Sequence, residues 1–312
     1  MATGSRVYVE GEVGLVFSGL SAFPLTPVSE DGVDEVAFGG LVGRLAAARV
    51  DSITALGSTG SYPYLERAER ARVARLAVEH AGDVPVLVGI GALRTREVRA
   101  LAEDAQRAGA AGVLLAPVSY QALTADEVFG LYEDVTGELS VPLVVYDNPG
   151  TTHFTFTDEL HARIAALPNV ASIKIPGVPP APAEAESRVS RLRSLLPESV
   201  TIGVSGDPLA ATGLNAGCEA WYSVVAGTLP EPALAITRAA LAGDAATANA
   251  ESERLRPLWE LFTRHGSFRV VSAIAEQLGL VSHPNLPRPV RALPEADRAD
   301  VTRVLHDLDL HR

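Results

Sequence analysis

Short apolar segments alternate with amphipathic segments along most of the chain. The apolar segments with the length of a buried strand are Gly14–Phe23, Ser52–Leu56, Val84–Ile90, Gly112–Ala116, Val141–Tyr146, Val170–Lys174, Val200–Val204 and Ala220–Val225. Two of them contain continuous apolar runs, Val84–Val88 and Pro142–Val145, rather than an alternating pattern. Such runs are typical of strands that are buried on both faces of a parallel sheet.

The segments between these strands predict capped, amphipathic helices. Thr124 and Glu127 form a capping box in front of one of them. Thr95 begins another helix, and Thr157 is the predicted cap of a helix that runs to Leu167. Strand–helix units at this regular spacing, about eight of them, predict a (β/α)₈ barrel. An open, doubly wound sheet is the competing fold, but no Gly-x-Gly-x-x-Gly turn follows the first strand.

The pattern changes near residue 230, where the strand signals stop. The segments that read as helices after this point are 230–241, 245–264, 267–278 and 295–308. We therefore predict a barrel over residues 10–230 and a C-terminal helical subdomain over residues 231–312. A length of 312 residues, 47% of them apolar, is sufficient for one large α/β domain with such an appendage.

Charge and composition exclude several classes of partner. The net charge of −12 gives the surface the wrong sign for binding nucleic acid or an anionic membrane. A single cysteine, Cys218, excludes an internal disulfide framework, and the seven histidines show no ligand spacing. We therefore expect neither a metal nor a cofactor. Met1–Gly14 has no apolar core like that of a signal peptide, and no stretch approaches the ~20 apolar residues of a membrane span, so we expect a cytoplasmic protein.

Lys174 is the only lysine among the 26 lysines and arginines of the chain. It ends the predicted strand Val170–Lys174 and is followed by the breaker Ile175–Gly177. An arginine stays protonated and cannot act as a nucleophile, whereas a desolvated lysine can lose its proton and attack a carbonyl group. The position indicates imine chemistry, and the alternative is an ordinary cation at the end of a strand.

Other polar residues follow the predicted strands at the end where barrel enzymes have their sites. Gly57–Ser61 follows the second strand, Tyr146–Thr152 the fifth, and Ser205–Asp207 the seventh. In this order, together with Lys174, they match motifs of one family. The chain resembles the dihydrodipicolinate synthase and N-acetylneuraminate lyase family of pyruvate-dependent class I aldolases, over roughly residues 14–280.

The resemblance implies a role for each motif. Lys174 forms the imine with pyruvate, and Tyr146 carries protons to and from it, with Thr59 as its expected partner. Gly57 and Gly60 let backbone N–H groups approach a small carboxylate, to which Ser58 and Thr59 add hydroxyl donors.

The alternatives are a plain strand–helix turn for this loop and a packing role for Tyr146. Asp207 is either a turn residue or a site residue. The backbone of Tyr222 matches a family position near the pyruvate pocket.

The second half of the family's site differs here. Family synthases have an arginine for the carboxylate of aspartate semialdehyde at the position of Thr151, and an asparagine at Asp147. The tyrosine that a neighbouring subunit lends to the relay is replaced by Ser119, with Tyr120 one residue later. We therefore expect aspartate semialdehyde to be a poor acceptor. The aromatic residues near these loops, among them Tyr62, either favour a less anionic acceptor or pack the rim.

We accordingly predict a lyase that forms a Schiff base with pyruvate, or another small 2-oxo acid, and makes or breaks an aldol bond with an unidentified aldehyde. Two alternatives stay open: a dehydratase or lyase of 2-keto-3-deoxy sugar acids, and a non-catalytic barrel that binds 2-oxo acids. The resemblance also implies a homotetramer built from dimers, with Tyr120 at the tight contact and within reach of the neighbour's site.

Overall fold

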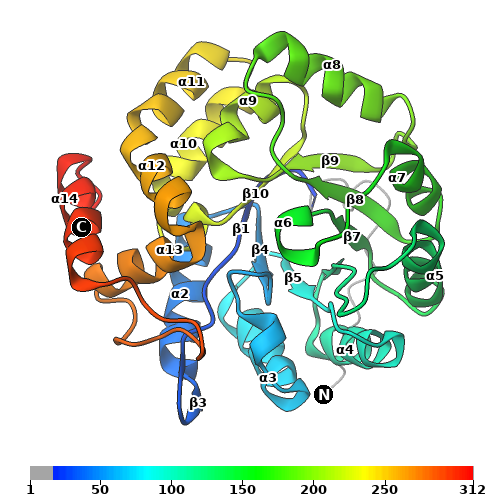
Figure 1. Cartoon of the computed structure of the whole chain (residues 1–312), viewed down its shortest axis with the longest axis horizontal. Helices are drawn as coiled ribbons and strands as arrows, with labels where there is room; N and C mark the ends of the chain where they lie inside the picture. Colours follow the sequence, from blue (N-terminus) through cyan, green and yellow to red (C-terminus); the bar gives the residue numbers. More distant parts are fainter. Residues whose placement is uncertain (1–16, 312) are drawn as a thin grey trace.

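The computed structural model describes residues 17–311 of the chain. Eight parallel strands close into a barrel in the order β1–β10–β9–β8–β7–β6–β5–β4 (Figure 1). They are β1 (Gly19–Ala22), β4 (Ser52–Ala55), β5 (Val86–Gly89), β6 (Gly112–Leu115), β7 (Leu143–Tyr146), β8 (Val170–Ile175), β9 (Thr201–Val204) and β10 (Ala220–Ser223). The predicted (β/α)₈ fold is confirmed. Within the described residues the strands are one to three residues shorter than the apolar runs, except β8, which gains Ile175. Residues 14–16 of the first predicted strand lie outside the described residues.

The helices form a ring around the barrel and then a C-terminal layer. Their bounds are α2 (Glu35–Ala48), α3 (Arg67–His80), α4 (Thr95–Ala108), α5 (Ala125–Thr136), α6 (Pro149–Thr152), α7 (Asp158–Ala165), α8 (Pro182–Arg193), α9 (Ala210–Asn215), α10 (Pro230–Leu241), α11 (Ala245–Arg254), α12 (Arg256–His265), α13 (Ser267–Gln277) and α14 (Glu295–Asp307). The 3₁₀ turns are η1 (Tyr62–Tyr64), η2 (Asp207–Leu209) and η3 (Val225–Gly227), and a two-stranded hairpin consists of β2 (Val28–Ser29) and β3 (Gly32–Val33).

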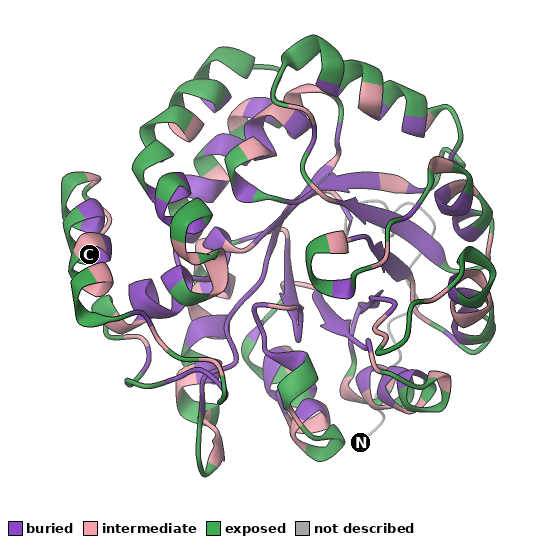
Figure 2. Cartoon of the chain, in the orientation of Figure 1, coloured by how far each residue is buried: buried purple, intermediate pink, exposed green. Residues whose placement is uncertain are grey.

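The strands separate two apolar cores. Leu87, Leu114 and Val144 belong to a cluster inside the barrel, whereas Leu143 and Val145 belong to the larger cluster between barrel and helices. This alternation follows from the pleat of each strand. Both faces of the strands are therefore buried, as Figure 2 shows. Hence the sequence of these strands is continuously apolar.

Two of the predicted helix N-caps are confirmed. Thr124 accepts a hydrogen bond from the backbone N–H of Glu127, whose side chain accepts one from the N–H of Thr124. Thr157 caps α7 by accepting from the N–H of Leu160. The α4 helix begins at Thr95, but no side chain caps it.

The single helix predicted over 245–264 is wrong, because the chain breaks into α11 and α12 at Leu255. Pro257 lies in the first turn of α12 and has no backbone N–H to donate to the preceding turn. The break changes the direction of the chain, so α12 contacts η2, which lies after β9.

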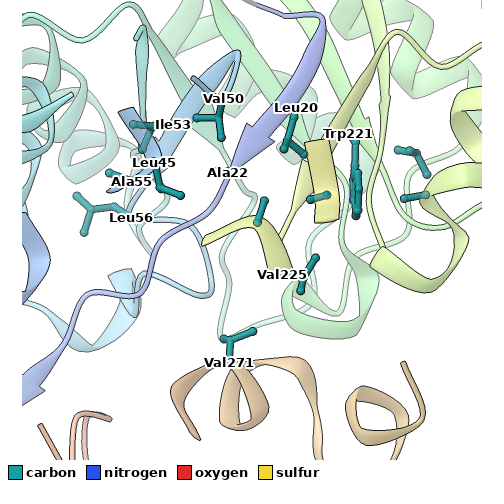
Figure 3. Close-up of a cluster of buried hydrophobic side chains, with 14 of the residues drawn as sticks. Leu20, Ala22, Leu45, Val50, Ile53, Ala55, Leu56, Trp221, Val225 and Val271 are labelled. Atoms are coloured by element: carbon teal, nitrogen blue, oxygen red, sulfur yellow. The ribbon is translucent and has the colours of Figure 1, made fainter. Parts of the chain in front are cut away.

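The C-terminal helices extend over the ends of the last barrel strands. The α10 helix contacts β1 and α9, and α13 contacts η3. In the part of the core drawn in Figure 3, Val271 of α13 lies near Val225. The division at residue 230 stays a prediction, since α10 packs directly on the barrel.

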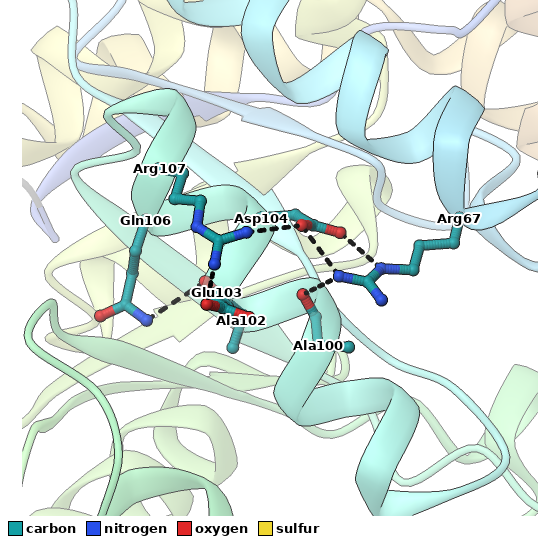
Figure 4. Close-up of polar contacts among 7 residues, drawn as sticks. All are labelled: Arg67, Ala100, Ala102, Glu103, Asp104, Gln106 and Arg107. Atoms are coloured by element: carbon teal, nitrogen blue, oxygen red, sulfur yellow. Dashed lines mark hydrogen bonds and ion pairs between the residues drawn. The ribbon is translucent and has the colours of Figure 1, made fainter.

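Ion pairs join neighbouring helices on the outside of the ring. The guanidinium of Arg67 on α3 donates to both carboxylate oxygens of Asp104 on α4, as Figure 4 shows. Arg67 is half-exposed, so solvent screens the pair and its contribution to stability is small. Among residues 17–311, no helix has the length and apolar character needed to cross a membrane.

Two glycines provide a matched test of the packing at the top of the barrel. A Cβ on Gly89 of β5 would lie 1.9 Å from the carbonyl oxygen of Leu56, whereas a Cβ on Gly40 of α2 would meet no atom within 4 Å. We expect Gly89→Ala to lower the free energy of unfolding by about 1–3 kcal/mol or more through overpacking. Gly40→Ala should raise it by about 0.5–1 kcal/mol because it restricts the unfolded chain. Urea denaturation measures both, and equal effects of the two variants would contradict the packing.

Candidate active site

A cavity of about 750 Å³ opens at the carboxyl ends of the barrel strands. Its lining includes Lys174 of β8, Tyr146 of β7, Tyr222 of β10, and Ser58 and Thr59 of the loop after β4. The fold thus brings into one cavity predicted site residues that are spread over 160 positions of the chain. This is the end of the barrel at which (β/α)₈ enzymes carry their sites.

Lys174 and Tyr146 are direct neighbours across two strands. Tyr146 is the last residue of β7 and pairs in register with Lys174 of β8. The Nζ atom of Lys174 lies 4.4 Å from the centre of the Tyr146 ring and 5.9 Å from that of Phe23. The register between β7 and β8 shifts at Leu143 and Val144, before this pair is reached. A bulge of this kind re-aims side chains next to a site.

The amine of Lys174 is desolvated. The side chain is buried, and this burial lowers the pKa of Lys174 below its ordinary value. Tyr146, Asp207 and Asp147 oppose the shift, since negative charge near the amine favours its protonated form. The net effect makes the neutral, nucleophilic form of the amine available at lower pH than in an exposed lysine.

Two side chains hold the hydroxyl of Tyr146. Its oxygen lies 3.0 Å from Oγ of Ser58 and accepts a hydrogen bond of 3.0 Å from Nδ2 of Asn148. Thr59 was the expected partner, but the hydroxyl that contacts the phenol oxygen of Tyr146 is that of Ser58. Thr59 is buried and lines the cavity one residue further along the loop. The loop turns between the two positions, and a sequence does not show which hydroxyl faces the tyrosine.

The loop from Gly57 to Ser61 packs closely against Phe23 and against the backbone of Leu56. A Cβ on Gly57 would lie 2.5 Å from the Phe23 ring, and one on Gly60 would lie 2.8 Å from the backbone nitrogen of Leu56. Neither glycine lines the cavity, so their visible role is close packing of the loop. Leu56 and Ser61, which flank the four central residues, have φ values of 57° and 58°. Positive φ at two non-glycine residues is strain of the kind that gathers at functional sites.

Asp207 and Tyr222 complete the inner wall of the cavity. Asp207 is buried, which raises its pKa, and its carboxylate accepts hydrogen bonds from Nε1 of Trp221 and from the N–H groups of Val224 and Val225. It therefore fixes the loop after β10 in addition to acting on Lys174. The hydroxyl of Tyr222 donates to Oγ of Ser172 at 2.7 Å, and Tyr222 lines the cavity. The role predicted for its backbone stays a prediction.

A buried pair behind the site was not predicted. Asp147, which follows Tyr146, has a carboxylate oxygen 3.3 Å from Nε2 of His161 on α7, and both side chains are buried. The imidazole of His161 is stacked on Phe156 with the ring centres 5.0 Å apart. His161 lies on the inner face of an ordinary amphipathic helix, so its position in the sequence does not indicate a role. The only sequence signal was Asp147, which stands where the family has an asparagine.

The remaining predicted site residues either line other parts of the cavity or lie outside it. Thr151, Tyr62 and Tyr64 line the cavity, whereas Tyr120 is 90% exposed and does not. Phe154 packs edge-to-face on Phe156, away from the cavity lining. Within residues 17–311, no group of three or more His, Cys, Asp or Glu side chains has an arrangement that would hold a metal ion.

The fold and the site together define a (β/α)₈ protein with a buried lysine beside a tyrosine at the carboxyl ends of the strands. The profile of the dihydrodipicolinate synthetase family matches residues 16–308. The chain belongs to this family.

Curated and solved relatives agree over almost the full length. The 4-hydroxy-tetrahydrodipicolinate synthase of Phenylobacterium zucineum is 30% identical over 95% of this chain and 98% of its own. A solved dihydrodipicolinate synthase from Agrobacterium tumefaciens is 47% identical, with a TM-score of 0.91 over 95% of this chain and 99% of its own. YagE from Escherichia coli K12, a prophage protein solved in complex with pyruvate, is 25% identical, with a TM-score of 0.85 over 94% and 99%.

Because Lys174 is the sole lysine, its pKa can be measured without assignment. Protein labelled with [¹⁵Nζ]lysine should give one side-chain resonance whose titration midpoint lies below that of an ordinary lysine, as burial requires. Asp147→Asn removes a negative charge that favours the ammonium form, so it should move the midpoint further down. The control Asp126→Asn, at an exposed position on α5, should leave it in place. A midpoint at or above the ordinary value would contradict the desolvation of the amine.

Proposed function

We propose that the protein is a pyruvate-dependent class I lyase in which Lys174 forms a Schiff base with pyruvate or another small 2-oxo acid. The observation that carries the proposal is the buried Nζ of Lys174, 4.4 Å from the ring of Tyr146 at the strand ends. Family membership and the relative solved with pyruvate support the choice of a 2-oxo acid.

The proposed chemistry begins at the neutral amine. Lys174 Nζ attacks the keto carbon of pyruvate, water leaves, and the protonated imine draws electrons from the methyl carbon. Loss of a methyl proton gives an enamine that attacks the carbonyl carbon of an aldehyde. The aldehyde oxygen takes up a proton, and hydrolysis of the imine releases a 4-hydroxy-2-oxo acid and free lysine. The reverse sequence cleaves such an acid, and no oxidant is needed in either direction.

Tyr146 is the proposed proton carrier, and Ser58 is its proposed partner. The phenol oxygen already receives one hydrogen bond from Asn148, so its proton can point to Ser58 or to a reacting oxygen. Thr59 is proposed to bind the pyruvate carboxylate with the backbone of its loop, since it lines the cavity without contacting Tyr146.

Trapping the imine tests the proposal directly. We expect pyruvate plus borohydride to inactivate the protein and to leave a reduced adduct on the peptide that contains Lys174. Lys174→Arg should be as inactive as Lys174→Ala, because a guanidinium keeps the charge but supplies no nucleophile. Peptide mass spectrometry checks the adduct, with protein treated with borohydride alone as the control. An unmodified Lys174 peptide after saturating treatment would refute the lyase.

The proton relay predicts a separation of kinetic effects. Tyr146→Phe should lower turnover roughly a hundredfold or more while pyruvate binding falls much less. Ser58→Ala should act mainly on kcat, and Thr59→Val mainly on KM for pyruvate. Steady-state kinetics with pyruvate release or consumption as the signal measure all three. An unchanged kcat in Tyr146→Phe would place the relay elsewhere.

The proposed assembly is a homotetramer built from dimers. Tyr120 is 90% exposed and Leu93 is 63% exposed, both in loops at the same end of the barrel, which is unusual for residues of this size. We expect light scattering to give the mass of a tetramer, and Tyr120→Ala to weaken it. A fully active monomer would refute both the assembly and a part for Tyr120 in a neighbour's site.

A further inference from the structure

The cavity is lined by side chains that have no part in the proposed binding of pyruvate. Four aromatic side chains line the cavity in addition to those near Lys174: Tyr62 and Tyr64 of η1, Phe262 of α12 and Phe268 of α13. Apart from Lys174 and Asp207, the polar side chains of the lining are uncharged, among them Asn148, Ser119, Thr151, Thr263 and Ser267. Pyruvate has only six heavy atoms, whereas cavities of about 300–1,000 Å³ hold ligands of drug size. The cavity, about 750 Å³, thus has room for a large second substrate.

The cavity offers no counter-ion for a charged acceptor. Lys174 is the only cationic residue among the described residues that line it, and the charge of the proposed protonated imine is balanced by the carboxylate of the pyruvate bound to it. Asp207 is the only carboxylate there, and it is occupied by Trp221 and two backbone N–H groups. Arg264 pairs with Asp300 on α14, and Arg269 donates to the carbonyl of Arg291. Arg70 of α3 lies 5.2 Å from the centre of the Tyr62 ring, but its guanidinium donates to the carbonyls of Gly89 and Gly91 and does not line the cavity.

Several of the hydroxyl groups of the lining are also engaged. Oγ1 of Thr152 donates to the carbonyl of Asn148, and Oγ of Ser205 donates to the carbonyl of Ile175. Oγ1 of Thr151 also points to the carbonyl of Asn148, at 3.4 Å. These hydroxyls can therefore accept hydrogen bonds from a substrate but have no free proton to donate to one. The aromatic side chains, by contrast, present ring faces and edges that suit another ring.

We propose that the acceptor is an uncharged aldehyde with an aromatic ring, held between the Tyr62–Tyr64 turn and the phenylalanines of α12 and α13. This rests on the proposed lyase function and specifies its second substrate. The enamine carbon bonds to the aldehyde carbon, and the carbonyl π electrons and a proton go to the aldehyde oxygen. The α12 helix, which begins after the break at Leu255, contacts η2, and its Phe262 lines the cavity.

A matched set of acceptors tests the proposal with pyruvate as the donor: benzaldehyde, 3-carboxybenzaldehyde and D-glyceraldehyde. The first two differ by one carboxylate, and the third replaces the ring by hydroxyl groups. We expect benzaldehyde to have a kcat/KM about tenfold or more above that of 3-carboxybenzaldehyde, because a desolvated carboxylate finds no partner. Product formation is followed by mass spectrometry of the 4-hydroxy-2-oxo acid or its dehydrated form.

Substitutions of the aromatic residues that line the cavity test whether the acceptor binds there. Tyr64→Ala and Phe268→Ala should each lower kcat/KM for benzaldehyde about tenfold, since truncating a pocket ring removes substrate contact. Tyr64 is 49% exposed, so its variant does not depend on the core. The control Leu241→Ala changes a residue of α10 that is 47% exposed and lies outside the cavity lining, and it should leave kcat/KM unchanged. Thr151→Arg supplies a cation and should reverse the preference toward 3-carboxybenzaldehyde.

The possible results distinguish a failure of the proposed aromatic acceptor from a failure of the proposed lyase activity. Borohydride trapping with pyruvate alone reports the imine without any acceptor. If the adduct forms but glyceraldehyde or 3-carboxybenzaldehyde is preferred over benzaldehyde, only the aromatic acceptor is refuted. If no adduct forms, the lyase and the acceptor fall together. A benzaldehyde preference that Tyr64→Ala and Phe268→Ala leave intact would also contradict this binding site.

Discussion

The desolvation of one amine is the constraint on which the rest of the site depends. Lys174 is buried at the end of β8, between the rings of Tyr146 and Phe23, and no carboxylate forms an ion pair with it among the described residues. A charged lysine in such a position is costly, and burial accordingly lowers its pKa. The same burial that would be a defect in a structural protein favours the neutral form of the amine, which is the form that the proposed nucleophile needs.

The barrel supplies this environment through its register and its closure. Because β7 and β8 pair in parallel, Tyr146 and Lys174 reach the same height and the same end of the sheet. The tight loop after β4 then brings Ser58 to the phenol from across the barrel. The outer cavity has a different origin, in η1 and in the helices α12 and α13. The proposed donor and acceptor halves are therefore built from different parts of the chain, so the acceptor half can differ between relatives while the barrel stays the same.

The sequence was sufficient for features that are fixed locally or by the strand pattern. The eight strands follow from their apolar runs, and the positions of Lys174 and Tyr146 follow from the strand ends. The sequence was insufficient where tertiary geometry decides. The choice between Ser58 and Thr59 depends on the turn of a strained loop. His161 and Phe268 lie on ordinary amphipathic helices, and nothing in their spacing shows that they reach the site.

A crystal structure of the protein soaked with pyruvate would test the central claim most directly. Our account predicts continuous electron density from Nζ of Lys174 to the keto carbon of pyruvate, with the phenol oxygen of Tyr146 beside the bond and the pyruvate carboxylate at Thr59. Pyruvate bound elsewhere, or bound in this cavity with no bond to Nζ at saturating concentration, would contradict it.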